Sequence, residues 1–203
     1  MRYLCYDTAL NEEYTLIQLL QRYPHAVSLF SGTDDEGIWD AAPWIFEVNT
    51  DCYALREEDT LIRLDRCIIF ETAEPREEVI RFLQGLFYKN TAEGPVYLRV
   101  WDARVLLDSF REWGEKDRQV FFEFFDCFYT EGAEPGSMDR WVLDKKQDLV
   151  AEERLLSGLF PEERVEDPGA AAAPGKKGFE GTAAPPPGSE PDPPPKRRRF
   201  FIE

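Results

Sequence analysis

Short runs rich in β-branched and aromatic residues recur along the chain, and turn residues bound each of them. Such runs are typical of strands that are at least half buried in a sheet. They predict strands at 2–6, 26–30, 44–48, 67–71 and 96–101, and a further short strand at 141–143.

Between these runs, apolar residues recur with the spacing of amphipathic helices. The clearest helix is predicted at 75–88, where Pro75 suits the first turn and apolar residues follow at i, i+3, i+4, i+7 and i+8 from Val79. Asn11 is expected to cap a helix that ends at Arg22. Further helices are predicted at 34–39, 56–63, 103–112, 116–129 and 146–160.

Strands that alternate with helices predict an α/β or α+β fold, with a single mixed β-sheet flanked by helices. We expect an α/β domain over residues 1–130, a variable helical segment over 131–165 as a short C-terminal helical extension, and a disordered tail over 166–203. Proline, alanine and glycine dominate that tail, and such a composition cannot form a packed core. The order of the strands stays open.

The charge of the chain restricts its partners. It has 40 acidic and 24 basic residues, a net charge of −16, and residues 1–160 alone hold 32 acids and 17 bases. Nucleic-acid binding needs a basic face, because phosphate contacts supply most of the affinity. We therefore expect neither nucleic acid nor a membrane surface as a partner, but a cationic protein surface, or an acidity that serves only solubility. Aromatic residues make up 14% of the chain, so some are expected to anchor a partner.

Residues suited to catalysis or metal binding are sparse. His25 is the only histidine, and the cysteines form no C-x-x-C pair: Cys5, Cys52, Cys67 and Cys127. A zinc site needs about four ligands at short spacings, and a serine or cysteine nucleophile usually needs a histidine base. The sequence therefore predicts no catalytic residue, no metal and no cofactor. Unpaired cysteines without a signal peptide or a long apolar run favour the cytoplasm.

Two groups of charged residues allow more than one interpretation. Asp34, Asp35, Glu36 and Asp40 follow a Ser-Gly-Thr turn, where they could form a metal or acid/base site, but capping of a helix start is favoured. Near the predicted strand 96–101, Asp102 is expected to cap the next helix and to pair with Arg99 or Arg104. The alternative is that one of these arginines binds a carboxylate of a partner.

Two segments together resemble a bacterial family of domains of unknown function whose members are adaptor-chaperones for type VI secretion effectors. The first, 28–48, carries the family pattern at Leu29, Phe30, Gly32, Thr33, Pro43 and Trp44. The second, 97–106, carries it at Arg99, Trp101, Asp102, Arg104, Val105 and Leu106. The resemblance covers about residues 3–129. Ala103 stands where the family usually has proline, and the Trp-Gly often found in the fourth strand is missing from 67–71.

The resemblance implies a protein without catalytic activity that binds a toxic effector in the producing cell and helps to load it onto the spike protein. Its hallmark positions serve either the fold or partner binding: Phe30, Gly32, Thr33, Pro43, Trp44, Arg99, Asp102 and Arg104.

Two other functions remain open. An immunity-type protein would neutralise a cationic toxin through its acidic surface. A hydrolase would require Asp35 to converge with Asp40 or Asp102 in a pocket. The basic tail, which contains Lys196, Arg197, Arg198, Arg199, Phe200 and Phe201, is expected either to dock on an acidic partner, to fold back as an added edge strand, or to remain solvated. In a eukaryotic protein it would read as a nuclear import signal.

Overall fold

The first strand, β1 (Arg2–Asp7), is buried on both of its faces. Tyr3 and Cys5 pack into one hydrophobic core, whereas Leu4 and Tyr6 pack into another. Successive side chains of a strand point to opposite faces, so β1 must lie inside a sheet that is covered on both sides. The computed structural model, which describes residues 1–48, 50–91 and 94–160, shows this arrangement.

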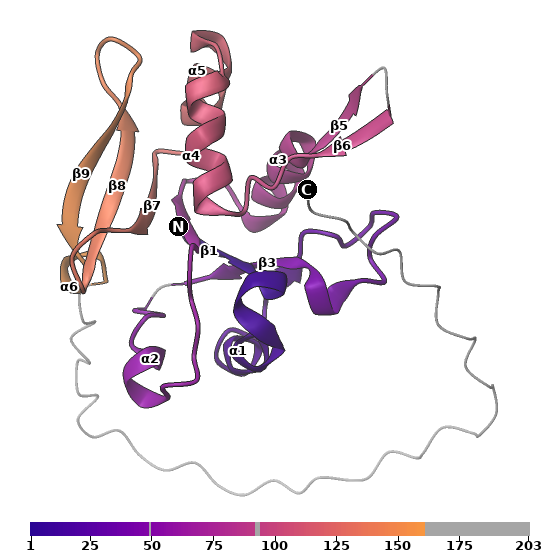
Figure 1. Ribbon diagram of the computed structural model, residues 1–203, viewed down its shortest axis with the longest axis vertical. Helices are drawn as coiled ribbons and strands as arrows, with labels where there is room; N and C mark the ends of the chain where they lie inside the picture. Colours follow the sequence, from indigo (N-terminus) through magenta and orange to yellow (C-terminus); the bar gives the residue numbers. More distant parts are fainter. Residues whose placement is uncertain (49, 92–93, 161–203) are drawn as a thin grey trace, which may run out of the picture. The chain divides into compact units, whose positions relative to one another are not determined.

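The central sheet has seven strands in the order β2-β3-β1-β4-β7-β8-β9. Of these, Figure 1 labels β1, β3, β7, β8 and β9. Every pairing in this sheet is antiparallel, and β1 lies between β3 and β4. The predicted single sheet flanked by helices is confirmed, but the sheet is antiparallel and not mixed. The strands are β2 (Val27–Ser28), β3 (Pro43–Glu47), β4 (Ile68–Glu71), β7 (Cys127–Glu131), β8 (Ser137–Leu143) and β9 (Leu149–Leu155).

Three helices cover one face of the sheet: α3 (Arg76–Phe87), α4 (Ala103–Glu112) and α5 (Glu115–Phe124). Their apolar stripes meet the sheet in a core dominated by phenylalanine. Phe70 of β4 stacks on Phe125 at 4.6 Å between ring centroids, and Phe110 of α4 meets Phe121 of α5 edge to face at 5.0 Å. Much of the aromatic surplus therefore stabilises this core, since each such pair adds about 0.5–1.5 kcal/mol to its burial.

The other face is covered by α1 (Thr8–Arg22), α2 (Leu55–Glu58) and α6 (Leu156–Leu159). The cap of α1 is Asp7, whose Oδ1 accepts a hydrogen bond from Ala9 N at 3.1 Å. The prediction that Asn11 caps this helix is wrong. Asn11 is fully buried, and its side chain instead bonds the backbone N–H and C=O of Asp65.

Several elements differ from their predicted bounds. The helix predicted at 116–129 ends at Phe124, and the chain continues into β7. The strand predicted at 96–101 is shorter, because β5 (Tyr88–Thr91) and β6 (Gly94–Tyr97) form a separate hairpin and Arg99 lies outside any strand. The predicted strand 26–30 contributes only β2, and a 3-10 helix, η1 (Trp39–Ala41), forms at the end of the segment expected to be helical.

The largest correction concerns the helix predicted at 146–160. Residues Leu149–Leu155 form strand β9, which pairs along its whole length with β8, and only Leu156–Leu159 are helical. The compact unit comprises Met1–Glu162, and the boundary predicted between residues 130 and 131 falls inside β7. The tail predicted at 166–203 lies outside the described residues.

Candidate functional site

The two hallmark segments meet at one buried carboxylate, that of Asp7. It lies at the junction of β1 and α1 and is only 3% exposed. Its Oδ1 caps α1, while its Oδ2 accepts hydrogen bonds from Arg99 Nη2 at 2.5 Å and from Trp101 Nε1 at 3.2 Å. Asp7 thus joins the first helix to a segment more than 90 residues further along the chain.

The first hallmark segment reaches this centre through a tight turn. Gly32 has a φ of +74°, a left-handed conformation that glycine adopts without strain. The hydroxyl of Thr33 donates to the carbonyl oxygen of Phe30 at 2.7 Å and closes the turn. Phe30 then packs edge to face on Trp101, with 6.0 Å between ring centroids. The pattern Leu-Phe-x-Gly-Thr therefore forms a turn that positions the ring of Phe30.

Pro43 and Trp44 fix the neighbouring strand. Pro43 lies opposite Asp7 in the pairing of β1 with β3, and its carbonyl oxygen accepts a hydrogen bond from Leu29 N at 2.8 Å. The half-buried Trp44 donates from Nε1 to the carbonyl oxygen of Trp39 at 3.2 Å, so it holds η1 against the sheet.

The second segment forms the corner before α4. Asp102, 1% exposed, accepts hydrogen bonds from the backbone N–H of Arg104 at 3.0 Å and from its guanidinium at 3.1 and 2.7 Å. Burial raises the pKa of this carboxyl, but the hydrogen bonds from Arg104 lower it more, and the net pKa lies below its usual value. The predicted cap and the predicted pair with Arg104 are both confirmed, whereas Arg99 pairs with Asp7.

The structure therefore places Arg99 and Pro43 beside Asp7, and Phe30 reaches the same centre through Trp101. Gly32 and Thr33 form the turn that carries Phe30. Arg104 instead pairs with Asp102, the cap of its own helix α4. The basic tail residues lie outside the described part of the chain.

Sequence reasoning missed two residues of this centre. Asp7 follows the strand predicted at 2–6 and has no predicted role, although an acidic residue between a strand and a helix is a signal for a helix cap. Gln84 of α3 donates from Nε2 to the carbonyl oxygens of Leu29 and Ser31, both at 3.0 Å, and so supports the turn. No local signal marks Gln84, because its partners are more than 50 residues away in the chain.

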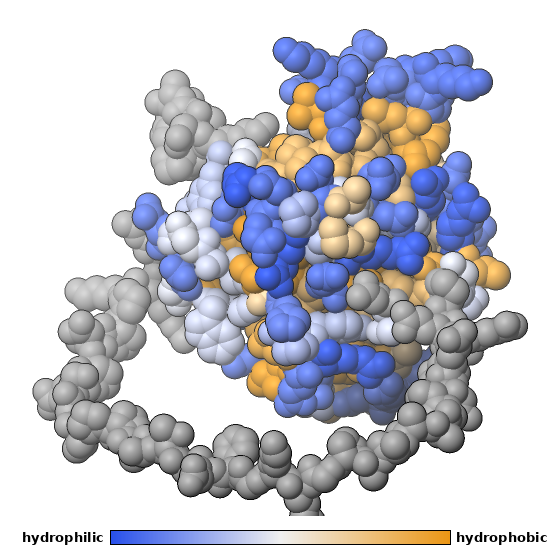
Figure 2. All heavy atoms as spheres, turned by 180° about the vertical axis from the view of Figure 1, so that it is seen from behind, coloured by the Kyte–Doolittle hydropathy of each residue, from blue (hydrophilic) through white to orange (hydrophobic). Residues whose placement is uncertain are grey.

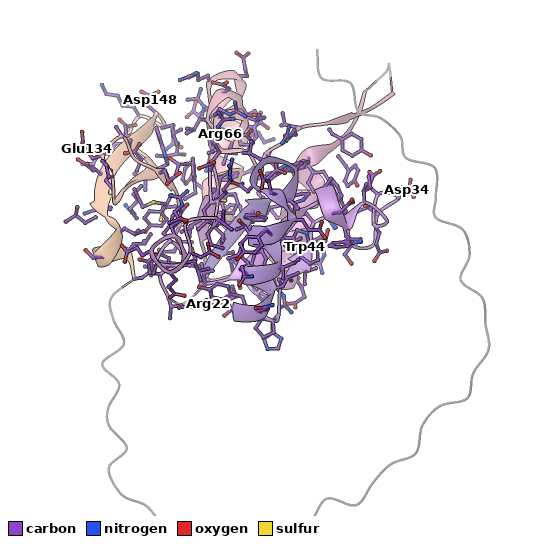
Figure 3. All side chains as sticks on the ribbon, turned by 60° about the horizontal axis from the view of Figure 1, so that its bottom comes forward. Arg22, Asp34, Trp44, Arg66, Glu134 and Asp148 are labelled. Carbon is purple, nitrogen blue, oxygen red and sulfur yellow. The ribbon has the colours of Figure 1, made fainter. Side chains whose placement is uncertain are left out.

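Two of the carboxylates named for a hydrolase, Asp35 and Asp102, are engaged by different partners. Asp35 accepts hydrogen bonds from the hydroxyls of Tyr88, at 3.1 Å, and Tyr97, whereas Asp102 is occupied by Arg104. Figure 3 shows the neighbouring Asp34 far from Asp148, which lies in the turn between β8 and β9 at the opposite side of the view. Among residues 1–48, 50–91 and 94–160, no group of three or more His, Cys, Asp or Glu side chains is placed to hold a metal ion. None of the helices in the same part of the chain is long and apolar enough to cross a bilayer.

These features define a scaffold: an antiparallel sheet between two helical layers, in which two distant segments are fixed on one buried carboxylate. The family model described as "Domain of unknown function (DUF4123)" matches residues 3–120, more than half of the chain and the whole of this centre. The chain belongs to this family. No curated protein and no solved structure matches it.

Proposed function

We propose that the chain is an adaptor-chaperone, without enzymatic activity, that binds a type VI secretion effector in the cytoplasm and helps to load it onto the spike protein. The observation that carries this proposal is the meeting of both hallmark segments at Asp7, within the residues that the family model matches. Because the hallmark side chains mostly hold the scaffold, the partner surfaces are expected elsewhere on it.

A patch on α1 offers one such surface. Tyr14 and Ile17 are 41% and 42% exposed, and Leu61 is 65% exposed. Asp59 links Tyr14 to Leu61, since it accepts hydrogen bonds from the hydroxyl of Tyr14 at 2.5 Å and from Leu61 N at 2.8 Å, and Ile17 lies one turn of α1 after Tyr14. We call these three residues, Tyr14, Ile17 and Leu61, the α1 patch. On the face drawn in Figure 2, apolar side chains likewise reach the surface between hydrophilic ones. Exposed apolar groups rimmed by polar residues are typical of protein-binding surfaces.

Co-purification tests the proposal. The tagged chain should capture its effector and the spike protein, and its deletion should stop delivery of the toxin. Leu61→Asp is expected to weaken capture of the effector at least about tenfold, because a charge would replace an apolar side chain that the effector covers in the complex. Val120→Asp on α5 is the matched control, since Val120 is 48% exposed on the opposite helical layer. If neither protein is captured and delivery continues after deletion, the proposal is wrong.

The charge of the chain motivates an immunity-type protein as a second candidate. Residues 1–160 hold 32 acids and 17 bases, a balance that suits a cationic toxin. Such a protein would protect a susceptible cell that produces only this chain, and its one-to-one inhibition of the toxin would weaken with salt. An adaptor gives no such protection.

A further inference from the structure

A shallow hollow of about 360 Å³ opens beside the end of β9, and its charge is opposite to that of the chain as a whole. Its lining includes Arg2, Arg140 and Arg154, together with Tyr129 and Leu155. Within the described part of the chain, the lining contains no acidic residue. Three guanidinium groups around one hollow are unexpected in a protein with a net charge of −16.

Neighbouring carboxylates neutralise these arginines only in part. Arg2 pairs with Glu71 at 2.9 Å. Arg140 and Arg154 share a single oxygen of Glu152, at 3.1 and 2.7 Å. Three positive groups therefore meet two negative ones, and one positive charge is left over. The side chains of Arg2 and Arg140 are only 30% and 28% exposed, so water screens this charge less than it would on an open surface.

The same hollow lies at an open edge of the sheet. Among the described strands, β9 pairs with β8 alone, so alternate residues along its seven-residue length present backbone N–H and C=O groups at its outer edge. Leu155, at the end of this edge, is 70% exposed, more than any other large apolar side chain in the described residues. An edge that ends at a cationic hollow and an exposed leucine combines three means of binding an extended peptide.

We infer that β9 and the arginine hollow bind an extended segment of a partner protein that carries a carboxylate next to an apolar side chain. The segment pairs with the outer edge of β9, its carboxylate takes up the positive charge beside Arg140 and Arg154, and its apolar side chain covers Leu155. This inference rests on the proposed function only in that the partner is a protein.

A peptide binding experiment with the full chain tests this inference. The probe is acetyl-TVEVEVT-amide, and its matched control has glutamine in place of both glutamates. The probe should slow amide hydrogen exchange in residues 149–155 and should bind at least about tenfold more tightly than the glutamine peptide, since hydrogen bonds to charged groups are worth about 1.5–3 kcal/mol. Arg154→Ala should weaken the probe about fivefold and leave the control peptide unchanged, because Arg154 is half exposed. Arg111→Ala, in an exposed pair on α4, should change neither.

Several outcomes would overturn the inference. They are equal binding of the two peptides, no added protection of β9, or an unchanged affinity in Arg154→Ala. Protection of β9 that rises with the concentration of the chain alone would assign this edge to a second copy, which also contradicts it. If the effector or spike protein is captured while β9 stays unprotected, this inference fails and the proposed function stands. If the probe binds as described but neither protein is captured, this inference stands and the proposed function fails.

Discussion

Replacement of Asp7 by alanine removes three hydrogen bonds from the centre where the hallmark segments meet. Loss of the cap of α1 costs about 1 kcal/mol. Trp101 is 6% exposed, so its Nε1–H is left without a partner in the interior, at a cost of about 1–2 kcal/mol. The Arg99 side chain is 38% exposed, so its guanidinium can bond to water once Asp7 is gone. Loss of this pair therefore costs less than about 1 kcal/mol. We expect the free energy of unfolding to fall by about 3 kcal/mol and the Tm by about 6–12 °C.

Urea unfolding followed by tryptophan fluorescence measures this loss. Asp108→Ala is the control, because Asp108 forms an exposed pair with Arg111 and its replacement should change the free energy of unfolding by less than about 0.5 kcal/mol. In a double-mutant cycle, Trp101→Phe removes the orphaned donor, and the two losses should be less than additive by about 1 kcal/mol. A loss below about 1 kcal/mol in Asp7→Ala, or strict additivity with Trp101→Phe, would refute the central role of this carboxylate.

Three further predictions follow from single groups. Gly32→Ala should destabilise the protein by about 1–2 kcal/mol because of its positive φ, whereas Gly85→Ala, inside α3 with open space at its Cβ, should stabilise it by about 0.5–1 kcal/mol; thermal unfolding separates the two signs. Because the folded pKa of Asp102 is lowered, its contribution is complete above the unfolded value of about 3.9 and is lost as the pH falls through the folded pKa. The stability gap between the wild type and Asp102→Asn, measured by urea unfolding, should therefore narrow below about pH 4, and a gap that widens there would contradict the argument. Burial raises the pKa of the four buried thiols, those of Cys5, Cys52, Cys67 and Cys127. A thiol reagent at pH 8 should therefore label them only after urea is added, and fast labelling of the native protein would contradict this.

The sequence predicted best those elements whose signals are local. α3 combines a proline before its first turn, acids at its start and an apolar stripe, and these all favour the same helix. The strands β1, β3 and β4 are short, rich in β-branched or aromatic residues and bounded by turns, so local sequence is enough to locate them.

The predicted helix at 146–160 was wrong because two signals conflict there. Its alanine, leucine, glutamate and arginine residues favour helix. The preceding turn, in which Asp144 Oδ1 accepts hydrogen bonds from the N–H groups of Lys146 and Asp148, instead reverses the chain so that Leu149–Leu155 pair with β8. Pairing with a neighbouring strand outweighed a modest helix propensity, as tertiary context often does. The same rule explains the end of α5, where β7 begins in phenylalanine-rich sequence that also suits a helix stripe.

The hallmark residues themselves show why the partner could not be predicted with the fold. Gly32 sets a turn, Thr33 closes it, and Arg99 joins two distant parts of the chain by binding a buried carboxylate, so each has a role in the scaffold itself. Positions of this kind are restricted by the geometry of the fold, whatever protein the scaffold binds. Under the proposed function, partner choice depends on exposed residues that the fold leaves free to vary, such as the α1 patch or the outer edge of β9. Substitutions at Leu61 or Arg154 should therefore change binding without changing stability, whereas those at Asp7 or Gly32 should lower both together.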